Sequence, residues 1–126
     1  MVEEIQRKLQ NEIDQFKQVQ KDYHKALSKR QQLDSQLNEN TVVKEELDLL
    51  KAGNEVYKLI GPVLIKQELI EAKENVNKRM AFISAEIKHT ENLIVTLDKK
   101  QETHRENLDK LQQSFQQAQI RAKIKN

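Results

Sequence analysis

The sequence predicts an all-α-dominated fold: a long antiparallel helical hairpin of coiled-coil type with one β-hairpin at its bend. Of the 126 residues 33% are charged, 37% are hydrophobic and only 4% are aromatic, which is too little apolar material for a thick core. A mean hydropathy of -0.85 is also found in disordered chains, but those are rich in proline and glycine. Here the two glycines and the one proline, Gly53, Gly61 and Pro62, all lie near the middle, so two long helices flank a central turn.

The first predicted helix covers about residues 1–51, and Gly53 in the string Lys51-Ala52-Gly53-Asn54 is expected to supply the left-handed conformation of its C-terminal cap. Its apolar residues recur mostly at steps of three, four or seven, as in a heptad seam. They are Val2, Ile5, Leu9, Phe16, Val19, Tyr23, Ala26, Leu33, Leu37 and Leu47. Polar residues interrupt the seam at Glu12, Arg30, Asn40 and Lys44. Such interruptions cost stability but fix the register and the choice of partner helix.

The second predicted helix covers about residues 68–124 and carries a matching seam. The seam consists of Leu69, Val76, Met80, Ile83, Ile87, Ile94, Leu97, Leu108, Leu111, Phe115, Ala118 and Ala122, with polar breaks at Lys73, Thr90, Gln101 and His104. An antiparallel arrangement brings the two chain termini together at one tip and places His104 across from the region of Glu12. A charge pair between these two residues is one interpretation, and a simple solvated or seam histidine is the other.

The central segment, about residues 55–67, predicts a β-hairpin because β-branched and aliphatic residues flank Gly61 and Pro62. Glycine can take the positive φ of the first position of a type II′ turn, and proline fits the negative φ of the second. Val56 and Ile60 are expected on one face, Tyr57 and Leu59 on the other. A lone two-stranded hairpin is marginal in water, so we expect strands of other chains to bury Val56, Leu59, Ile60, Leu64 and Ile65.

Composition also indicates which partners are not expected. The net charge is only +2 with both signs interspersed, and there is no cysteine, so neither a basic nucleic-acid surface nor a disulfide framework is predicted. The N-terminus is charged from its third residue, and the apolar run from Ile60 to Ile65 is interrupted by Gly61 and Pro62. We therefore expect no secretory signal and no membrane partner, and a cytoplasmic location with the nucleus as an alternative.

The sequence does not predict catalysis or a bound cofactor. His24, His89 and His104 are too far apart for a metal pair at helical spacing, and neither glycine belongs to a phosphate-binding motif. The many acidic and hydroxyl side chains suit solvated helix faces. We therefore expect a non-enzymatic protein with no catalytic residues, no cofactor and no metal site.

Three strings of residues resemble a known family. Val43-Lys44-Glu45-Glu46-Leu47, the run from Val56 to Leu69 containing Lys58-Leu59-Ile60-Gly61-Pro62, and Ile83-Ser84-Ala85-Glu86-Ile87-Lys88 resemble the β-type prefoldin subunits. The resemblance covers essentially the whole chain, and its hairpin string is far more specific than a coiled-coil pattern. It implies a hexamer of two α-type and four β-type subunits. The hairpins of that hexamer form a β-barrel from which the coiled coils project, so the partners of this chain are two α-type and three further β-type subunits.

The resemblance also implies a function: ATP-independent capture of unfolded or nascent proteins, actin and tubulin above all, and their delivery to the cytosolic group II chaperonin. The candidate assembly residues are Val56, Tyr57, Leu59, Ile60, Gly61, Pro62, Val63, Leu64 and Ile65. The candidate client-binding residues at the tip formed by the two chain ends are Val2, Ile5, Leu9, Leu111, Phe115, Ile120 and Ile124, although several of them could simply close the coiled coil. The alternative function is that of a structural coiled-coil subunit in a prefoldin-like scaffold or assembly complex.

Overall fold

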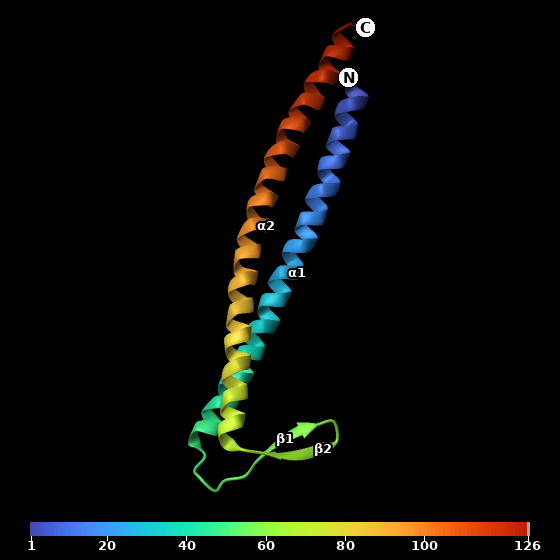
Figure 1. Ribbon diagram of the computed structural model, residues 1–126. Coiled ribbons are helices and arrows are strands. Elements are labelled where there is room, and N and C mark those ends of the chain that lie inside the picture. Colours follow the sequence, from blue (N-terminus) through green and yellow to red (C-terminus); the bar gives the residue numbers. More distant parts are fainter. Residues whose placement is uncertain (126) are drawn as a thin grey trace. The chain divides into compact units, whose positions relative to one another are not determined.

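The computed structural model describes residues 1–125, and it confirms the predicted fold class. Helix α1 (Val2–Leu49) is followed by strands β1 (Val56–Ile60) and β2 (Val63–Gln67) and by helix α2 (Leu69–Lys125) (Figure 1). The chain forms two compact units. The terminal unit contains residues 1–28 and the described part of 91–126, and the hairpin unit contains residues 29–90. No helix of the described chain combines the length and the apolar composition that crossing a bilayer requires.

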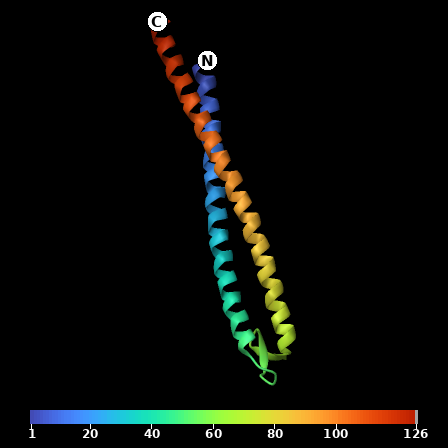
Figure 2. The ribbon, with the colours of Figure 1, turned by 90° about the vertical axis from the view of Figure 1, so that its left-hand side faces the viewer.

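In the terminal unit the first half of α1 runs antiparallel to the second half of α2, and the two chain ends lie near each other (Figures 1 and 2). Ala26 and Leu97 are buried, and the other predicted seam residues of this unit are half-buried, with one exception. Ala122 is exposed because it lies beside the first turn of α1, where no further turn covers it. The heptad pattern therefore located the seam but not its end.

The hairpin unit has a small apolar core at the base of the two helices. Leu47, Ala72 and Val76 are buried, and the residues packed against them are Leu50, Val56, Leu69 and Met80. The sequence prediction omitted Ala72, although it follows Leu69 by three residues and precedes Val76 by four, which places it on the same helix face. Val56 belongs to β1, so this core joins the first strand to both helices.

The connection between α1 and β1 contains a tight turn. The amide of Asn54 donates to the carbonyl oxygen of Lys51 at 3.1 Å, and the side-chain oxygen of Asn54 accepts from the amide of Lys51 at 2.7 Å. Gly53 has a φ of 102°, which is the positive value that the third position of a type II turn requires. The sequence predicts that Gly53 caps the helix directly. Instead α1 ends at Leu49, and the glycine belongs to a separate turn over residues 51–54.

The two strands form an antiparallel hairpin in the register that the sequence predicts. Leu59 pairs with Leu64 and Ile60 with Val63, so Gly61 and Pro62 alone form the loop. Gly61 has a φ of 58°, whereas no non-glycine residue of the described chain has a positive φ. A positive value followed by a negative one is the pattern of a type II′ turn, whose twist matches that of paired strands.

Candidate functional site: an exposed hairpin and a groove between the chain ends

The hairpin presents two different faces. Side chains alternate between faces along a strand, and directly paired residues of an antiparallel hairpin share a face. From the observed register, the first face, here called the Lys58 face, consists of Val56, Lys58, Ile60, Val63, Ile65 and Gln67. The second, the Tyr57 face, consists of Tyr57, Leu59, Leu64 and Lys66. Both faces are therefore mainly apolar.

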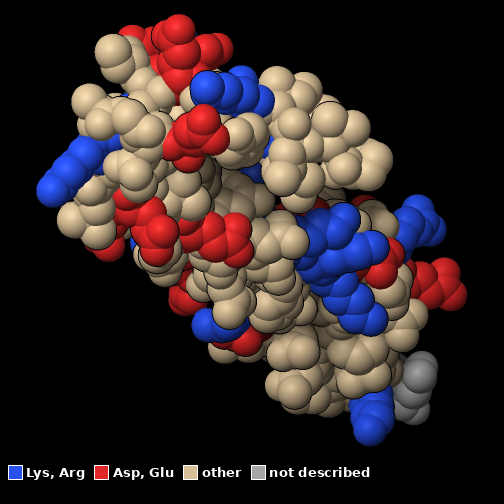
Figure 3. Space-filling model, turned by 90° about the horizontal axis from the view of Figure 1, so that it is seen from below, with Lys and Arg blue, Asp and Glu red and all other residues tan. Residues whose placement is uncertain are grey.

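Most of this apolar surface is open to solvent. Six large side chains, Tyr57, Leu59, Ile60, Val63, Leu64 and Ile65, are between 48% and 67% exposed. Only Val56, packed against the core of the hairpin unit, is half-buried. Within the described chain the sheet has two strands, so the outer edge of each strand has no neighbouring strand. Figure 3 shows uncharged surface with basic and acidic groups scattered across it, so neither sign dominates this view.

A polar cluster orders the base of the Tyr57 face. The hydroxyl of Tyr57 donates to Oε2 of Glu55 at 2.6 Å, and Nζ of Lys66 lies 3.7 Å from Oε1 of the same carboxylate. The hydrogen bond to Glu55 raises the pKa of Tyr57 above its ordinary value. Because Tyr57 and Lys66 are a cross-strand pair, Glu55 contacts side chains of both strands where they leave the helices.

At the chain ends an open groove of about 760 Å³ runs between α1 and α2 in the terminal unit. Its lining consists of Met1, Val2, Glu3, Ile5, Ser114, Gln117, Ala118, Arg121 and Ala122. Val2 and Ile5 were among the predicted client-binding residues, but the groove residues of α2 were not. The sequence signal for them was already present, because Ala118 and Ala122 continue the predicted seam.

The structure divides the predicted tip residues between two surfaces. Leu9, Leu111 and Phe115 are half-buried along the seam. Ile120 and Ile124 are 57% and 78% exposed. Each follows a groove-lining alanine by two residues, and a step of two turns a helix by about 200°, so the two isoleucines lie on the opposite side of α2. The tip therefore has a groove and a separate outer apolar surface.

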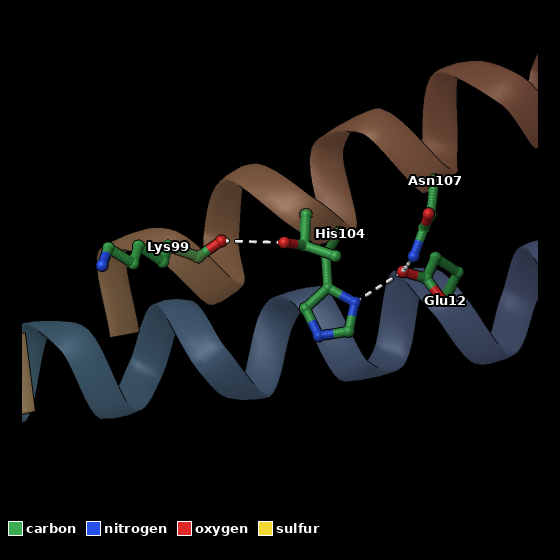
Figure 4. A network of polar contacts seen from close by, with 5 residues as sticks. Glu12, Lys99, His104 and Asn107 are labelled. Atoms are coloured by element: carbon green, nitrogen blue, oxygen red, sulfur yellow. Dashed lines mark hydrogen bonds and ion pairs between the residues drawn. The ribbon is translucent and has the colours of Figure 1, made fainter. Parts of the chain in front are cut away.

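Between the groove and the middle of the chain, a polar network crosses the seam of the terminal unit (Figure 4). Nδ1 of His104 lies 2.5 Å from Oε1 of Glu12, and Nδ2 of Asn107 donates to the same oxygen at 3.2 Å. The pKa of Glu12 is lowered, chiefly by the hydrogen bond from His104, with help from Asn107 and from the charge of His104, while burial opposes the shift. Of the two interpretations of His104 that the sequence leaves open, the contact with Glu12 is the one that the structure shows. Asn107 was missed, although it lies three residues after His104 and so on the same face.

These residues form a contact between helices and not a metal centre. In the part of the chain that the structure describes, no three histidine, cysteine or acidic side chains converge as metal ligands. Two apolar surfaces of the described chain are the hairpin with its open edges and the groove between the two helix ends.

Comparison with known proteins decides the family. A family model described as prefoldin subunit matches residues 10–115. The chain belongs to the prefoldin subunit family. It is 53% identical over 119 residues to prefoldin subunit 6 of Mus musculus, with 94% of each chain covered. It is equally similar to prefoldin subunit 6 of Homo sapiens, covering 94% of this chain and 92% of that one. It is 45% identical to prefoldin subunit 6 of Arabidopsis thaliana, with the same coverage.

Among solved structures, the prefoldin beta subunit from Thermococcus strain KS-1 matches with a TM-score of 0.47 and 21% identity, covering 88% of this chain and 91% of that one. The family model and the relatives of 45–53% identity confirm the family resemblance noted from the hairpin string. Prefoldin subunits belong to a non-enzymatic chaperone family and assemble with other prefoldin subunits. This chain is accordingly a prefoldin-type chaperone subunit.

Proposed function

We propose that this chain joins two α-type and three further β-type subunits through its hairpin, and that the tip of its helices holds unfolded or nascent proteins without ATP. Actin and tubulin are the proposed clients, and the cytosolic group II chaperonin is the proposed recipient. The observation that carries the proposal is the hairpin, whose six large exposed apolar residues accompany two open strand edges.

Such a hairpin is unfavourable as a free surface. Open edges present unpaired backbone groups to other strands, and a two-stranded sheet needs further strands or packing to be stable. Strand addition by a neighbouring chain satisfies the backbone groups and buries the apolar side chains at once. A subunit of an oligomeric family therefore has both the means and the need to assemble at this hairpin.

The terminal unit supports a holding role. The groove beside Val2, Ile5 and Ala118 is open, and Ile120 and Ile124 offer a second apolar contact. Each contact is small, but several subunits acting on one client bind through avidity without locking it in place. Both glycines of the chain occupy turns, outside the glycine-rich pattern that cradles phosphates, so the proposed mechanism requires no nucleotide.

The decisive experiment replaces Leu59 and Leu64 by Asp in the full chain and purifies the complex with its sister subunits. We expect the double variant to be lost from the complex while circular dichroism shows that its helices persist. The matched control replaces Leu93 and Val95, which are also exposed apolar residues but lie on α2, by Asp and should assemble normally. A double hairpin variant that stays in an intact complex would refute the assembly role.

The second candidate function is a structural subunit of a prefoldin-like scaffold, which the same exposed hairpin would also serve. A client assay separates the two functions. Purified complex should suppress aggregation of denatured actin in buffer without nucleotide, whereas a pure scaffold should not. A strict need for hydrolysable ATP would contradict the holding mechanism.

We place the assembled chain in the cytoplasm, with the nucleus as the alternative, and cell fractionation distinguishes these locations.

A further inference from the structure

Lys58 occupies an unusual position in the hairpin. It is the central residue of the five-residue strand β1, and its cross-strand partner is Ile65. The residues on either side of it on the same face are Val56 and Ile60, and the one other polar residue of this face, Gln67, carries no charge. Within residues 1–125 no carboxylate pairs with Lys58. Lys66, on the Tyr57 face, has Glu55 at 3.7 Å.

The missing countercharge becomes important when the Lys58 face is covered. An ammonium that leaves water without an opposite charge or hydrogen-bond acceptors carries a large desolvation cost. Lys58 is the middle residue of its strand. A flat surface that covers this face of the hairpin therefore also covers the ammonium group. The subunit that covers this face must therefore supply a group that accepts the charge of Lys58.

We propose that Lys58 selects the partner of this hairpin, and that the sister subunit covering the Lys58 face places an Asp or Glu carboxylate against its Nζ atom. This inference rests on the proposed assembly through the hairpin. It adds the chemistry of the partner strand: apolar residues to meet Val56, Ile60 and Ile65, with one acidic residue among them.

The same lysine disfavours a second copy of this chain as the partner. If two β1 edges met antiparallel about their centres, Lys58 would lie directly opposite Lys58 of the other copy, and like charges in that position are destabilising. If two β2 edges met antiparallel about Ile65, each Leu64 would lie opposite Lys66 of the other copy, so an apolar side chain would face a charged one. A charge directed into an apolar face is a known way of restricting strand pairing. The hairpin is thus apolar enough to associate, yet its charge favours a different chain.

Carbodiimide cross-linking of the purified complex tests the contact directly. The reagent condenses a lysine amine with a carboxylate that touches it and releases the equivalent of one water, leaving an amide bond. We expect mass spectrometry to find Lys58 joined to an Asp or Glu of a sister subunit. Cross-links at other lysines of the same complex without one at Lys58 would overturn the proposal.

Variants of the full chain test the energetic role. Lys58→Met keeps the length of the side chain and removes the charge, so the sister carboxylate loses its partner and assembly should weaken at least tenfold. Lys58→Glu places two carboxylates together and should weaken assembly further. Lys78→Met and Lys78→Glu make the same changes at an exposed α2 lysine and should have no effect. Equal assembly of Lys58→Met and wild type would mean that the ammonium reaches solvent on its flexible stem, and would overturn the inference.

The failure of this inference can be told apart from failure of the assembly proposal. If the Leu59 and Leu64 double variant leaves the complex while both Lys58 variants stay in it, assembly through the hairpin stands and the selection by Lys58 is wrong. If the double variant also stays in the complex, the hairpin is not the interface and both proposals are wrong. In the isolated chain, sedimentation should show more self-association for Lys58→Met than for wild type, because the opposing cations are gone.

Discussion

Oε1 of Glu12 and Nδ1 of His104 lie 2.5 Å apart across the seam of the terminal unit, although the residues are 92 positions apart in the chain. Their side chains are only 15% and 18% exposed, so the contact is largely sheltered from water. An apolar seam alone tolerates a slip of one heptad, but a buried polar pair is satisfied in one register only. Glu12 and His104 therefore set the register of α1 against α2 in this unit.

The first prediction is that Glu12→Ala destabilises the chain by about 1–2 kcal/mol, because two donors lose a charged acceptor in a half-buried place. The donors are His104 and Asn107. Urea unfolding followed by circular dichroism measures the change. Glu106→Ala, a substitution of the same type at an exposed α2 position, is the control and should change stability by less than about 0.5 kcal/mol. Equal effects of the two substitutions would show that the contact does not stabilise the seam.

The second prediction concerns pH. Glu12 has a pKa below its ordinary value of 4.5 in the folded chain, so its contribution to stability is fully present above that value and is lost as the pH falls through the lowered folded pKa. The Tm of the wild type should therefore exceed that of Glu12→Gln at pH 6, and the difference should shrink as the pH falls below 4.5. A difference in Tm that stays constant from pH 6 to pH 3 would contradict the assigned role of the carboxylate.

The sequence was informative where one side chain type decides the structure. Gly61 and Pro62 fixed the hairpin loop, because only that order of residues suits the signs of φ that the turn requires. Heptad spacing likewise located the seams. It could not show which polar seam residue finds a partner on the opposite helix, since that depends on distance and rotamer. Glu12 meets His104 across the helices, whereas Thr90, another predicted polar break, bonds within its own helix.

The third prediction follows from that contrast. Thr90 is 1% exposed, and its hydroxyl donates to the carbonyl oxygen of Glu86 at 2.8 Å. Thr90→Val keeps the branched shape and removes a hydroxyl whose bond is local, so the free energy of unfolding should change by less than about 0.5 kcal/mol or rise. Thr90→Ser keeps the hydroxyl and removes a buried methyl group, which should cost about 1 kcal/mol. A larger loss for valine than for serine would show that the hydroxyl stabilises the seam.

Element ends and partner contacts were less accessible from the sequence. Gly53 was read as the helix cap, but α1 stops at Leu49, because the side chain of Asn54 closes a separate turn with Lys51. The tip residues were predicted as one site, yet helical rotation separates Ile120 and Ile124 from the groove. The residues proposed to cover the hairpin belong to other chains, and the only feature of this chain from which we infer their chemistry is the unmatched charge at Lys58.

The fourth prediction is that deletion of residues 1–9 together with 117–126 leaves the chain able to assemble with its sister subunits. These segments belong to the terminal unit, whereas the hairpin belongs to the other unit. Capture of denatured actin, measured by light scattering, should nevertheless weaken because both the groove and the outer isoleucines are removed. Unchanged capture would move the client contact inward along the helices or onto the sister subunits.

The fifth prediction uses point substitutions, because a truncation also removes seam residues that hold the two helices together. Ile120 and Ile124 are 57% and 78% exposed, so replacing both by Ser should change the stability of the chain by no more than about 0.5–1 kcal/mol. Full burial of an aliphatic side chain contributes about 1.5–3 kcal/mol, so loss of even partial burial against a client is measurable. Assembled complex carrying the double variant should therefore require a severalfold higher concentration to prevent actin aggregation.

Ser replacements at Val42 and Leu49, which are exposed on α1 of the hairpin unit, are the control. If the control and the tip variant lose capture equally, exposed apolar area anywhere on the helices serves the client, and the tip has no special role.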